Sequence, residues 1–213
     1  MSELDLSKPE EQIPFQSRTA LTEFRDAVQR IKNEIGKIIV GQHHMVELMI
    51  AAILSDGHIL IEGVPGVAKT LAAKLMARSL STDFSRIQFT PDLMPSDVLG
   101  PTVFTPQTTE FEFRQGPIFS QVVLIDEINR APAKTQAALF EVMEERQITL
   151  DGHTYPMKPP FIVIATQNPI EQEGTYPLPE AQLDRFLFKI EVDYPAEADE
   201  LRMLNEFHVR KGI

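Results

Sequence analysis

Short apolar runs alternate with helical patterns along the chain, and this order restricts the fold more than any other feature of the sequence. Three of the runs are apolar at consecutive positions, which is typical of parallel strands covered by helices on both faces. Helical patterns over residues 69–80 and 132–145 lie between runs and suit crossover connections. The sequence therefore predicts an α/β fold with a parallel sheet. The predicted strands cover residues 58–61, 86–89, 122–125, 161–165 and 186–192.

Two helices are expected before the first strand. Residues 1–16 show no periodicity and contain two prolines, so they are predicted to form a flexible leader on the surface. A helical stripe follows, with apolar residues three or four positions apart. Its members are Leu21, Phe24, Val28, Ile31 and Ile35. A second helical pattern contains Val46, Met49, Ile50 and Ile53. Because no linker or internal repeat interrupts residues 17–213, we expect one domain there.

Two further pairs of short strand patterns interrupt the alternation and are predicted to be inserted hairpins. The first joins residues 102–105 to 110–114, and the second joins 147–150 to 154–157. The Asp-Gly pair at 151–152 is the stronger turn signal, because both residue types accept the positive φ of a tight hairpin turn. Both hairpins are expected to be insertions in the single domain.

Charge and composition exclude several classes of function. The chain has 20 basic and 31 acidic residues and a formal net charge of −11, which repels nucleic-acid backbones unless one face is locally basic. Without cysteine, a disulfide framework and a thiolate zinc site are excluded, and the five histidines lack partners at ligand spacing. No apolar run is long enough to span a bilayer, and the acidic start is unlike a secretory signal. A cytoplasmic location therefore fits best.

Residues 63–70 read Gly-Val-Pro-Gly-Val-Ala-Lys-Thr and lie between a predicted strand and a predicted helix. This is the phosphate-loop pattern, with Ala68 in the place of its second glycine. Backbone N–H groups at a helix start bind polyphosphate, while the Lys69 ammonium would neutralise charge and the Thr70 hydroxyl would ligate magnesium. Taken alone, the octapeptide also fits a glycine-containing turn before a helix.

Asp126 and Glu127 directly follow the apolar run 122–125. In nucleotide hydrolysis the first acid at such a strand end holds magnesium, and the second orients and deprotonates the attacking water. An acid pair of this kind also fits a helix cap or a solvated loop. The phosphate loop upstream favours the catalytic interpretation.

Asn168 and Arg185 are two further candidates near the ends of predicted strands. The Asn168 amide could hold the lytic water against a terminal phosphate, although asparagine before proline also forms turns. Arg185 ends a short helical pattern just before the last strand and could act as an arginine finger. The alternative for Arg185 is a surface ion pair with Asp184 or Glu180.

Four segments together resemble the MoxR family of AAA+ P-loop ATPases and cover most of residues 36–192. They are GVPGVAKT at 63–70, LIDEINRAPAKTQAALFEVMEERQITLDG at 124–152, ATQNP at 165–169 and LPEAQLDRF at 178–186. The second segment is far more specific than any phosphate loop. The alanine variant of the loop is familiar in that family.

The resemblance implies ATP and Mg²⁺ as cofactors and assigns a role to each candidate residue. The implied phosphate loop, Walker A, consists of Gly63, Val64, Pro65, Gly66, Val67, Ala68, Lys69 and Thr70. Asp126 and Glu127 correspond to Walker B, with Thr70 and Asp126 at the metal and Glu127 as the catalytic acid. Asn168 corresponds to sensor 1, and Arg185 would reach the γ-phosphate of a neighbouring subunit. Gly41 and Gln42 resemble the segment beside adenine.

The resemblance also implies an architecture and partners. The expected fold is a three-layer sandwich around a five-stranded sheet of order 5-1-4-3-2, in which the two hairpins are the helix-2 insert and the pre-sensor-1 hairpin. The first hairpin is expected to be either a moving element or a static one. MoxR relatives form homo-oligomeric, hexameric rings and act in chaperone-like remodelling, maturation or metal-cofactor insertion, often beside proteins with von Willebrand factor A domains. These properties are expectations for this chain.

One departure from the family pattern concerns the lid. AAA+ modules continue into a helical lid with a sensor-2 arginine, whereas only residues 196–213 follow the last predicted strand here. The chain is either a fragment or a minimal core, and in both cases weak ATP affinity and hydrolysis are expected of it in isolation.

Two alternative functions remain open from the sequence. A nucleotide-gated adaptor would bind ATP with little hydrolysis, but such a protein could dispense with Glu127, which is present. A nucleic-acid-linked AAA+ motor would share the hairpins, but residues 102–114 contain one arginine against two glutamates. An ATPase that remodels a partner protein is therefore preferred.

Overall fold

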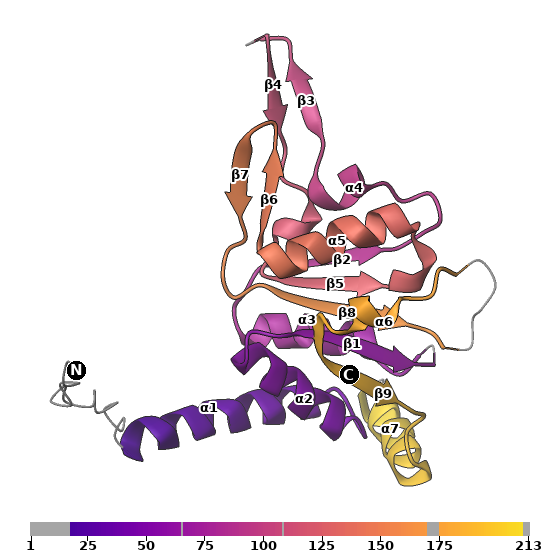
Figure 1. Ribbon diagram of the computed structural model, residues 1–213. Coiled ribbons are helices and arrows are strands. Elements are labelled where there is room, and N and C mark those ends of the chain that lie inside the picture. The colour runs from indigo at the N-terminus through magenta and orange to yellow at the C-terminus, as the bar shows by residue number, and fades with distance from the viewer. Residues whose placement is uncertain (1–17, 65, 108, 170–174, 211–213) are drawn as a thin grey trace, which may run out of the picture.

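A parallel five-stranded sheet forms the centre of the computed structural model, which describes residues 18–64, 66–107, 109–169 and 175–210. Its strands are β1 (His58–Gly63), β2 (Phe84–Gln88), β5 (Val122–Asp126), β8 (Ile162–Gln167) and β9 (Phe186–Val192). They lie side by side in the order β2-β5-β8-β1-β9 (Figure 1). Numbered among themselves along the chain and read from the β9 edge, these strands have the order 5-1-4-3-2. The predicted α/β fold and strand order are confirmed.

The three strands with consecutive apolar residues occupy the middle of the sheet, as predicted. β5 is buried at every residue, and β1 and β8 are buried at all but one. The edge strand β2 begins at Phe84, two residues earlier than predicted, because Phe84 and Ser85 also pair with β5. Polar residues are tolerated there because an edge strand is not enclosed on all sides.

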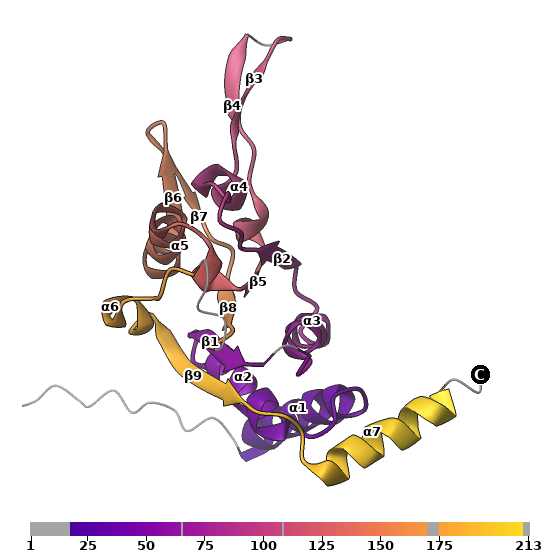
Figure 2. The same ribbon diagram turned by 90° about the vertical axis from the view of Figure 1, so that its right-hand side faces the viewer.

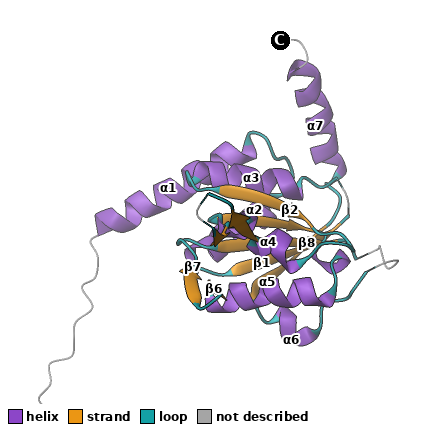
Figure 3. Cartoon of the chain, turned by 90° about the horizontal axis from the view of Figure 1, so that it is seen from above, coloured by secondary structure: helices purple, strands orange, loops and turns teal. Residues whose placement is uncertain are grey.

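Helices cover both faces of the sheet and complete a three-layer sandwich (Figures 2 and 3). One face carries α1 (Arg18–Gly36), α2 (His43–Leu54) and α3 (Lys69–Ser79), and the other carries α4 (Pro95–Leu99) and α5 (Ala133–Glu145). Alternate residues of β5 divide between the layers. Val122 and Leu124 belong to the apolar cluster with α1, α2 and α3, whereas Val123 and Ile125 belong to the cluster with α5.

The predicted stripe of α1 is only partly used for packing. Ile35 is 1% exposed and belongs to the core, and Val28 and Ile31 pack against it. Leu21 and Phe24 are 61% and 50% exposed. The N-terminal half of α1 extends past the sheet (Figure 1), so the apolar spacing predicted the helix but not how much of it would be covered.

Both predicted hairpins are present and project from the same end of the molecule (Figure 1). They are formed by β3 (Thr102–Thr105) with β4 (Glu110–Phe113), and by β6 (Gln147–Leu150) with β7 (His153–Pro156). Asp151 and Gly152 have φ of 51° and 78°, which is the turn geometry that the Asp-Gly pair predicts. The rings of Phe113 and Tyr155 join the hairpins, with centroids 4.7 Å apart.

The remaining helices are short or lie at the end of the described chain. They are η1 (Pro117–Phe119), η2 (Ile128–Arg130), α6 (Glu180–Leu183) and α7 (Glu197–Arg210). Helix α7 points away from the sheet (Figure 2), and its Leu201 and Leu204 are exposed. Among the residues that the structure describes, none of the helices has the length and apolarity that crossing a membrane requires.

His58, at the start of β1, is a buried histidine in its neutral form. Its Nδ1 accepts a hydrogen bond from the Val163 N–H at 3.0 Å, and its Nε2 lies 3.1 Å from the Met143 carbonyl oxygen. Burial is the largest effect on the pKa of His58 and lowers it, and the charge of Arg146 lowers it further. The hydrogen bond to Met143 and the charge of Asp56 act in the opposite direction, but the net shift is downward. The neutral ring is therefore part of the folded state.

This arrangement predicts that the protein loses stability in mild acid. Because the pKa of His58 is lower in the folded state, the neutral ring contributes fully to the free energy of unfolding at pH values above the unfolded pKa of about 6.5. This contribution is lost as the pH falls below about 6.5 toward the folded-state pKa. The free energy of unfolding, measured in urea between pH 7.5 and 5, should fall by up to about 1.4 kcal/mol per pH unit from this one proton. His58→Gln should flatten the profile, and an unchanged slope would contradict the assignment.

Candidate functional site

The segment from Gly63 to Thr70 joins the end of β1 to the start of α3. Gly63 lies against β9, where a Cβ would meet the Val192 carbonyl oxygen at 2.5 Å, so only glycine fits. Gly66 has φ of 90°, a left-handed conformation that favours glycine. Val67 is buried and Val64 packs partly against the core. Of the predicted loop residues, Pro65 lies outside the described part of the chain.

Ala68, the departure from the phosphate-loop pattern, has a left-handed backbone conformation, which favours glycine. It has φ of 60° and ψ of 20° and immediately precedes α3. An L-residue in this left-handed region costs about 1–2 kcal/mol. The loop geometry therefore requires a conformation that its alanine does not favour.

Ala68→Gly is expected to stabilise the protein by about 0.5–1 kcal/mol, because relief of the left-handed strain outweighs the larger entropy that glycine loses on folding. Urea unfolding measures the change. The matched control is Ala72→Gly in the interior of α3, where Ala72 is buried; this variant should be destabilised by about 1 kcal/mol or more. Equal destabilisation of both variants would contradict the strain argument.

Lys69 and Thr70 form the first turn of α3. The Lys69 Nζ donates a hydrogen bond to the Gly63 carbonyl oxygen at 2.5 Å, which folds the side chain back over the loop. Burial lowers the pKa of Lys69, and the nearby Asp126 and Glu127 carboxylates partly offset this by favouring the charged form. A cation is thus held between the loop and two acids.

Asp126, the last residue of β5, is 7% exposed, and both of its carboxylate oxygens have partners. Oδ1 accepts a hydrogen bond from the Thr166 hydroxyl at 3.1 Å, and Oδ2 accepts one from Arg86 Nε at 2.5 Å. Such partners are required because a buried carboxylate is costly without compensation.

Glu127 follows Asp126 in a left-handed conformation, with φ of 57°. Its Oε2 accepts a hydrogen bond from Gln88 Nε2 at 2.7 Å and lies 3.2 Å from Arg130 Nε. Its backbone N–H donates to the Thr166 hydroxyl oxygen at 3.1 Å. Thr166 therefore fixes both acids relative to β8.

These side chains surround one cavity of about 180 Å³ at the carboxyl ends of the central strands. Lys69, Thr70, Asp126, Glu127 and Asn168 come from three separate predicted segments, and all five line it. The full lining is Gly66, Lys69, Thr70, Arg86, Gln88, Asp126, Glu127, Thr166, Gln167 and Asn168.

Four residues that line the cavity were not predicted as site residues, namely Arg86, Gln88, Thr166 and Gln167. Arg86 and Gln88 are two positions apart on β2 and so project from the same face. The sequence did carry a signal for these two residues, because polar side chains stand at alternate positions of a strand that ends beside the phosphate loop. Thr166 was part of a quoted motif, but nothing in its spacing indicated a bond to Asp126.

Arg185 does not join this cavity. It precedes β9 at the amino ends of the strands, opposite to the carboxyl ends where the other candidates lie. Its Nη2 donates to Glu144 Oε2 and its Nη1 to the Ala181 carbonyl oxygen, each at 2.6 Å. The ion-pair partner is therefore Glu144 of α5 rather than Asp184 or Glu180, because helix α5 ends beside α6.

Gly41 and Gln42 lie near the carboxyl end of β9 and do not line the cavity. Gln42 Nε2 donates to the Asp193 carbonyl oxygen at 3.3 Å. Gly41 has φ of 80° and lies so close to α7 that a Cβ would meet Asp199 Oδ2 at 2.8 Å. Since β9 pairs with β1, the segment lies on the same edge of the sheet as the phosphate loop.

The donors at the cavity fit magnesium better than zinc. Within residues 18–64, 66–107, 109–169 and 175–210, no group of three or more His, Cys, Asp or Glu is arranged to hold a metal ion. The Thr70 hydroxyl and the Asp126 carboxylate supply hard oxygen ligands, and Mg²⁺ is usually held by one or two such groups plus phosphates and water. The site therefore fits a metal that arrives with a phosphate ligand.

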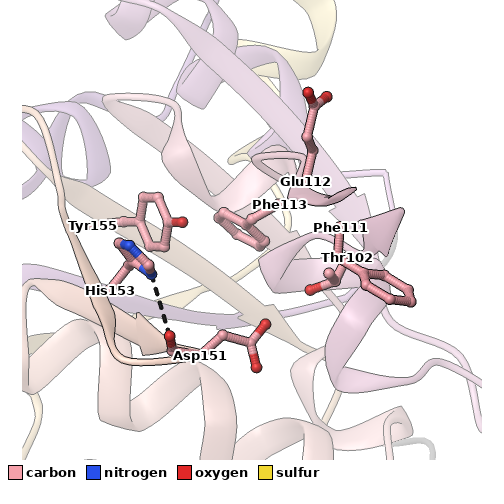
Figure 4. A pocket seen from close by; sticks show the side chains of 7 residues that line it. All are labelled: Thr102, Phe111, Glu112, Phe113, Asp151, His153 and Tyr155. Atoms are coloured by element: carbon pink, nitrogen blue, oxygen red, sulfur yellow. Dashed lines mark hydrogen bonds between the residues drawn. The ribbon is translucent and has the colours of Figure 1, made fainter. Parts of the chain in front are cut away.

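A second cavity of about 880 Å³ lies between the two hairpins (Figure 4). Phe113 and Tyr155, whose rings are in contact, line it together, and Asp151 and His153 lie at the turn of the β6–β7 hairpin. Its lining includes three aromatic residues and two acids, whereas the phosphate-loop cavity is lined by two cations and two acids without an aromatic residue, so the two cavities differ in chemistry.

Comparison with known proteins agrees with this geometry. The model of the ATPase family associated with various cellular activities (AAA) matches residues 58–188. The chain is 55% identical to the chaperone MoxR1 of Mycobacterium tuberculosis over 177 residues, which are 83% of this chain and 47% of that protein. It is also 55% identical to the uncharacterized protein YeaC of Bacillus subtilis over 171 residues, 80% of this chain and 53% of YeaC.

A solved structure supports the same relationship. The crystal structure of a candidate ATPase from Cytophaga hutchinsonii matches with a TM-score of 0.73 and 47% identity, covering 88% of this chain and 59% of that one. The chain spans about half the length of the curated relatives that it matches. Its sheet, its phosphate loop and these matches together show that the chain belongs to the AAA family of ATPases, in its MoxR branch.

Proposed function

We propose that this chain binds Mg²⁺-ATP at the phosphate-loop cavity and hydrolyses it to remodel a partner protein. The observation that carries the proposal is the convergence of Lys69, Thr70, Asp126, Glu127 and Asn168 on one cavity. The cavity, at about 180 Å³, is smaller than the roughly 300 Å³ at which pockets for whole small molecules begin, so it suits the phosphates, with the adenosine outside.

Each residue has a role that its position supports. The Lys69 ammonium and the N–H groups before α3 would bind the phosphates, and Thr70 and Asp126 would hold the metal. Glu127 would accept a proton from the attacking water, and Asn168 would orient that water. Gly41 and Gln42, on the same edge of the sheet, would contact the adenine side of the nucleotide.

Hydrolysis is proposed to be completed between subunits of a homo-oligomeric, hexameric ring. Arg185 lies at the opposite ends of the strands from its own cavity, so it cannot serve that cavity directly. In a head-to-tail ring, one subunit's Arg185 would face the next subunit's phosphates. A guanidinium supplied in this way is a known means of stabilising the charge of phosphoryl transfer.

The β3–β4 hairpin is the proposed contact for the partner protein. Phe104 and Phe111 lie opposite each other on one face, with ring centroids 5.3 Å apart, and they are 47% and 73% exposed. Exposed aromatic pairs of this kind are typical of protein-binding surfaces. The acidic residues Glu110 and Glu112 on the other face disfavour nucleic acid as the partner.

Nucleotide binding tests the proposed site. Lys69→Ala should weaken the affinity for Mg²⁺-ATP by about 10- to 100-fold, because a charge-assisted contact to phosphate is lost. Isothermal titration calorimetry measures the affinity. Lys74→Ala is the matched control, because Lys74 is an exposed lysine of the same helix. Equal affinities of the Lys69 variant and the wild type would contradict the proposed site.

A further inference from the structure

Arg86 of β2 lines the cavity, has no role in the proposed reaction and contacts the metal-binding acid. Its Nε lies 2.5 Å from Asp126 Oδ2. The Asp126 side chain is 9% exposed, whereas that of Arg86 is 52% exposed. Arg86 therefore reaches from the open side of the cavity onto the carboxylate at its base.

The other contacts of Asp126 show which of its two carboxylate oxygens Arg86 occupies. Oδ1 is bound by the Thr166 hydroxyl, so Oδ2 is the oxygen that Arg86 covers. The other cation in the cavity, Lys69, donates to the Gly63 carbonyl oxygen. Of these two cations, Arg86 is the one that makes a close ion pair with Asp126, and it occupies the oxygen that a metal would need.

We propose that Arg86 is a displaceable counter-ion of the metal site. Its guanidinium holds Asp126 Oδ2 while the site lacks metal, and it gives up this oxygen when Mg²⁺ arrives with a phosphate ligand. This inference rests on the proposed nucleotide site and adds a residue to it. A guanidinium and a divalent cation at one carboxylate oxygen repel each other, so each weakens the binding of the other.

The displaced guanidinium remains tethered to the cavity. Arg86 Nη2 donates to Gln88 Oε1 at 3.1 Å, and Gln88 Nε2 in turn donates to Glu127 Oε2. Released from Asp126, the guanidinium lies within a cavity whose ligand is a phosphate, and arginine binds phosphate oxygens through paired N–H groups. A phosphate contact offsets part of the cost of leaving Asp126, and the remainder of that cost weakens metal binding.

The consequence is that wild-type protein binds metal less tightly than its ligands allow. Arg86→Gln removes the competing charge, so the affinity for metal in the nucleotide complex should rise. An ion pair that is partly open to solvent corresponds to an increase of about two- to fivefold. Arg86→Lys keeps a charge without the fork of N–H groups and should give a smaller increase.

The test uses Mn²⁺ as the probe, with a non-hydrolysable ATP analogue at saturating concentration. Free Mn²⁺ is measured by electron paramagnetic resonance as the protein is titrated. Arg30→Gln is the matched control, because it removes the same charge from an exposed position on α1, outside the cavity. We expect tighter Mn²⁺ binding in R86Q and the wild-type affinity in R30Q.

A second measurement separates this role from a purely structural one. Without metal, R86Q should unfold at a lower temperature than the wild type, because Asp126 loses its counter-ion. Saturating Mn²⁺ and analogue should remove the difference, since the metal takes over that role. A structural role alone would leave the difference in place.

The outcomes of the Mn²⁺ titration test the competition by Arg86 separately from the proposed nucleotide site. Mn²⁺ binding that is unchanged or weaker in R86Q would overturn the competition, while nucleotide-dependent Mn²⁺ binding in the wild type would leave the proposed function intact. Absence of nucleotide-dependent Mn²⁺ binding in every protein, wild type included, would overturn both.

Discussion

Glu127→Gln is expected to lower ATP turnover by about 10²- to 10⁴-fold while leaving Mg²⁺-ATP bound, because the substitution removes the proton acceptor but keeps the shape of the side chain. The amide can still contact Gln88, which donates to Glu127 Oε2 in the structure. Phosphate release and nucleotide affinity are to be measured on the same preparation. The expected result is a large loss of rate with little change in affinity.

Glu141→Gln is the control for this variant, since Glu141 is an exposed acid of α5 that does not line the cavity. It should retain the wild-type rate. If Glu127→Gln also released phosphate at the wild-type rate, the chain would be a nucleotide-gated adaptor rather than an ATPase.

Arg185→Ala is expected to lower turnover per subunit by about 10³- to 10⁵-fold in the assembled ring, the range that an arginine finger contributes. ATP binding to the same variant should persist, because Arg185 lies at the other end of the strands from the cavity. Arg202→Ala is the control, since Arg202 pairs with Glu206 on the exposed α7. Unchanged turnover in the Arg185 variant would show that this residue is not the finger.

Mixed rings distinguish a contribution between subunits from one within a subunit. Arg185→Ala subunits retain Glu127, and Glu127→Gln subunits retain Arg185. If the finger acts on the neighbouring subunit, mixing the two inactive proteins should restore part of the activity. No recovery in rings shown to contain both variants would contradict action between subunits.

Much of the fold could be predicted because burial leaves a clear pattern in the sequence. Residues 122–125 and 161–165 are apolar at consecutive positions, and both segments became central strands. The Asp-Gly pair predicted the turn of the second hairpin, since few other pairs accept positive φ twice. The chain order of the strands, however, does not by itself give their order in the sheet, which came from the resemblance.

What could not be predicted depends on contacts between distant segments. Arg86 lies on an edge strand, where a polar residue is ordinary, and only the register with β5 brings it to Asp126. The alternative considered for Arg185 was an ion pair with an acid of its own segment, but the packing of α5 supplied Glu144. The apolar spacing in α1 likewise predicted a helix but did not indicate that Leu21 and Phe24 are exposed.

The central claim is that a magnesium-bound triphosphate occupies the cavity between the loop 63–70 and the ends of β5 and β8. The most direct test is a crystal structure with Mg²⁺ and a non-hydrolysable ATP analogue. We expect the terminal phosphate within hydrogen-bonding distance of Lys69 and Asn168, with the metal beside Thr70 and Asp126. A nucleotide bound elsewhere, with these four side chains making no contact to it, would contradict the account.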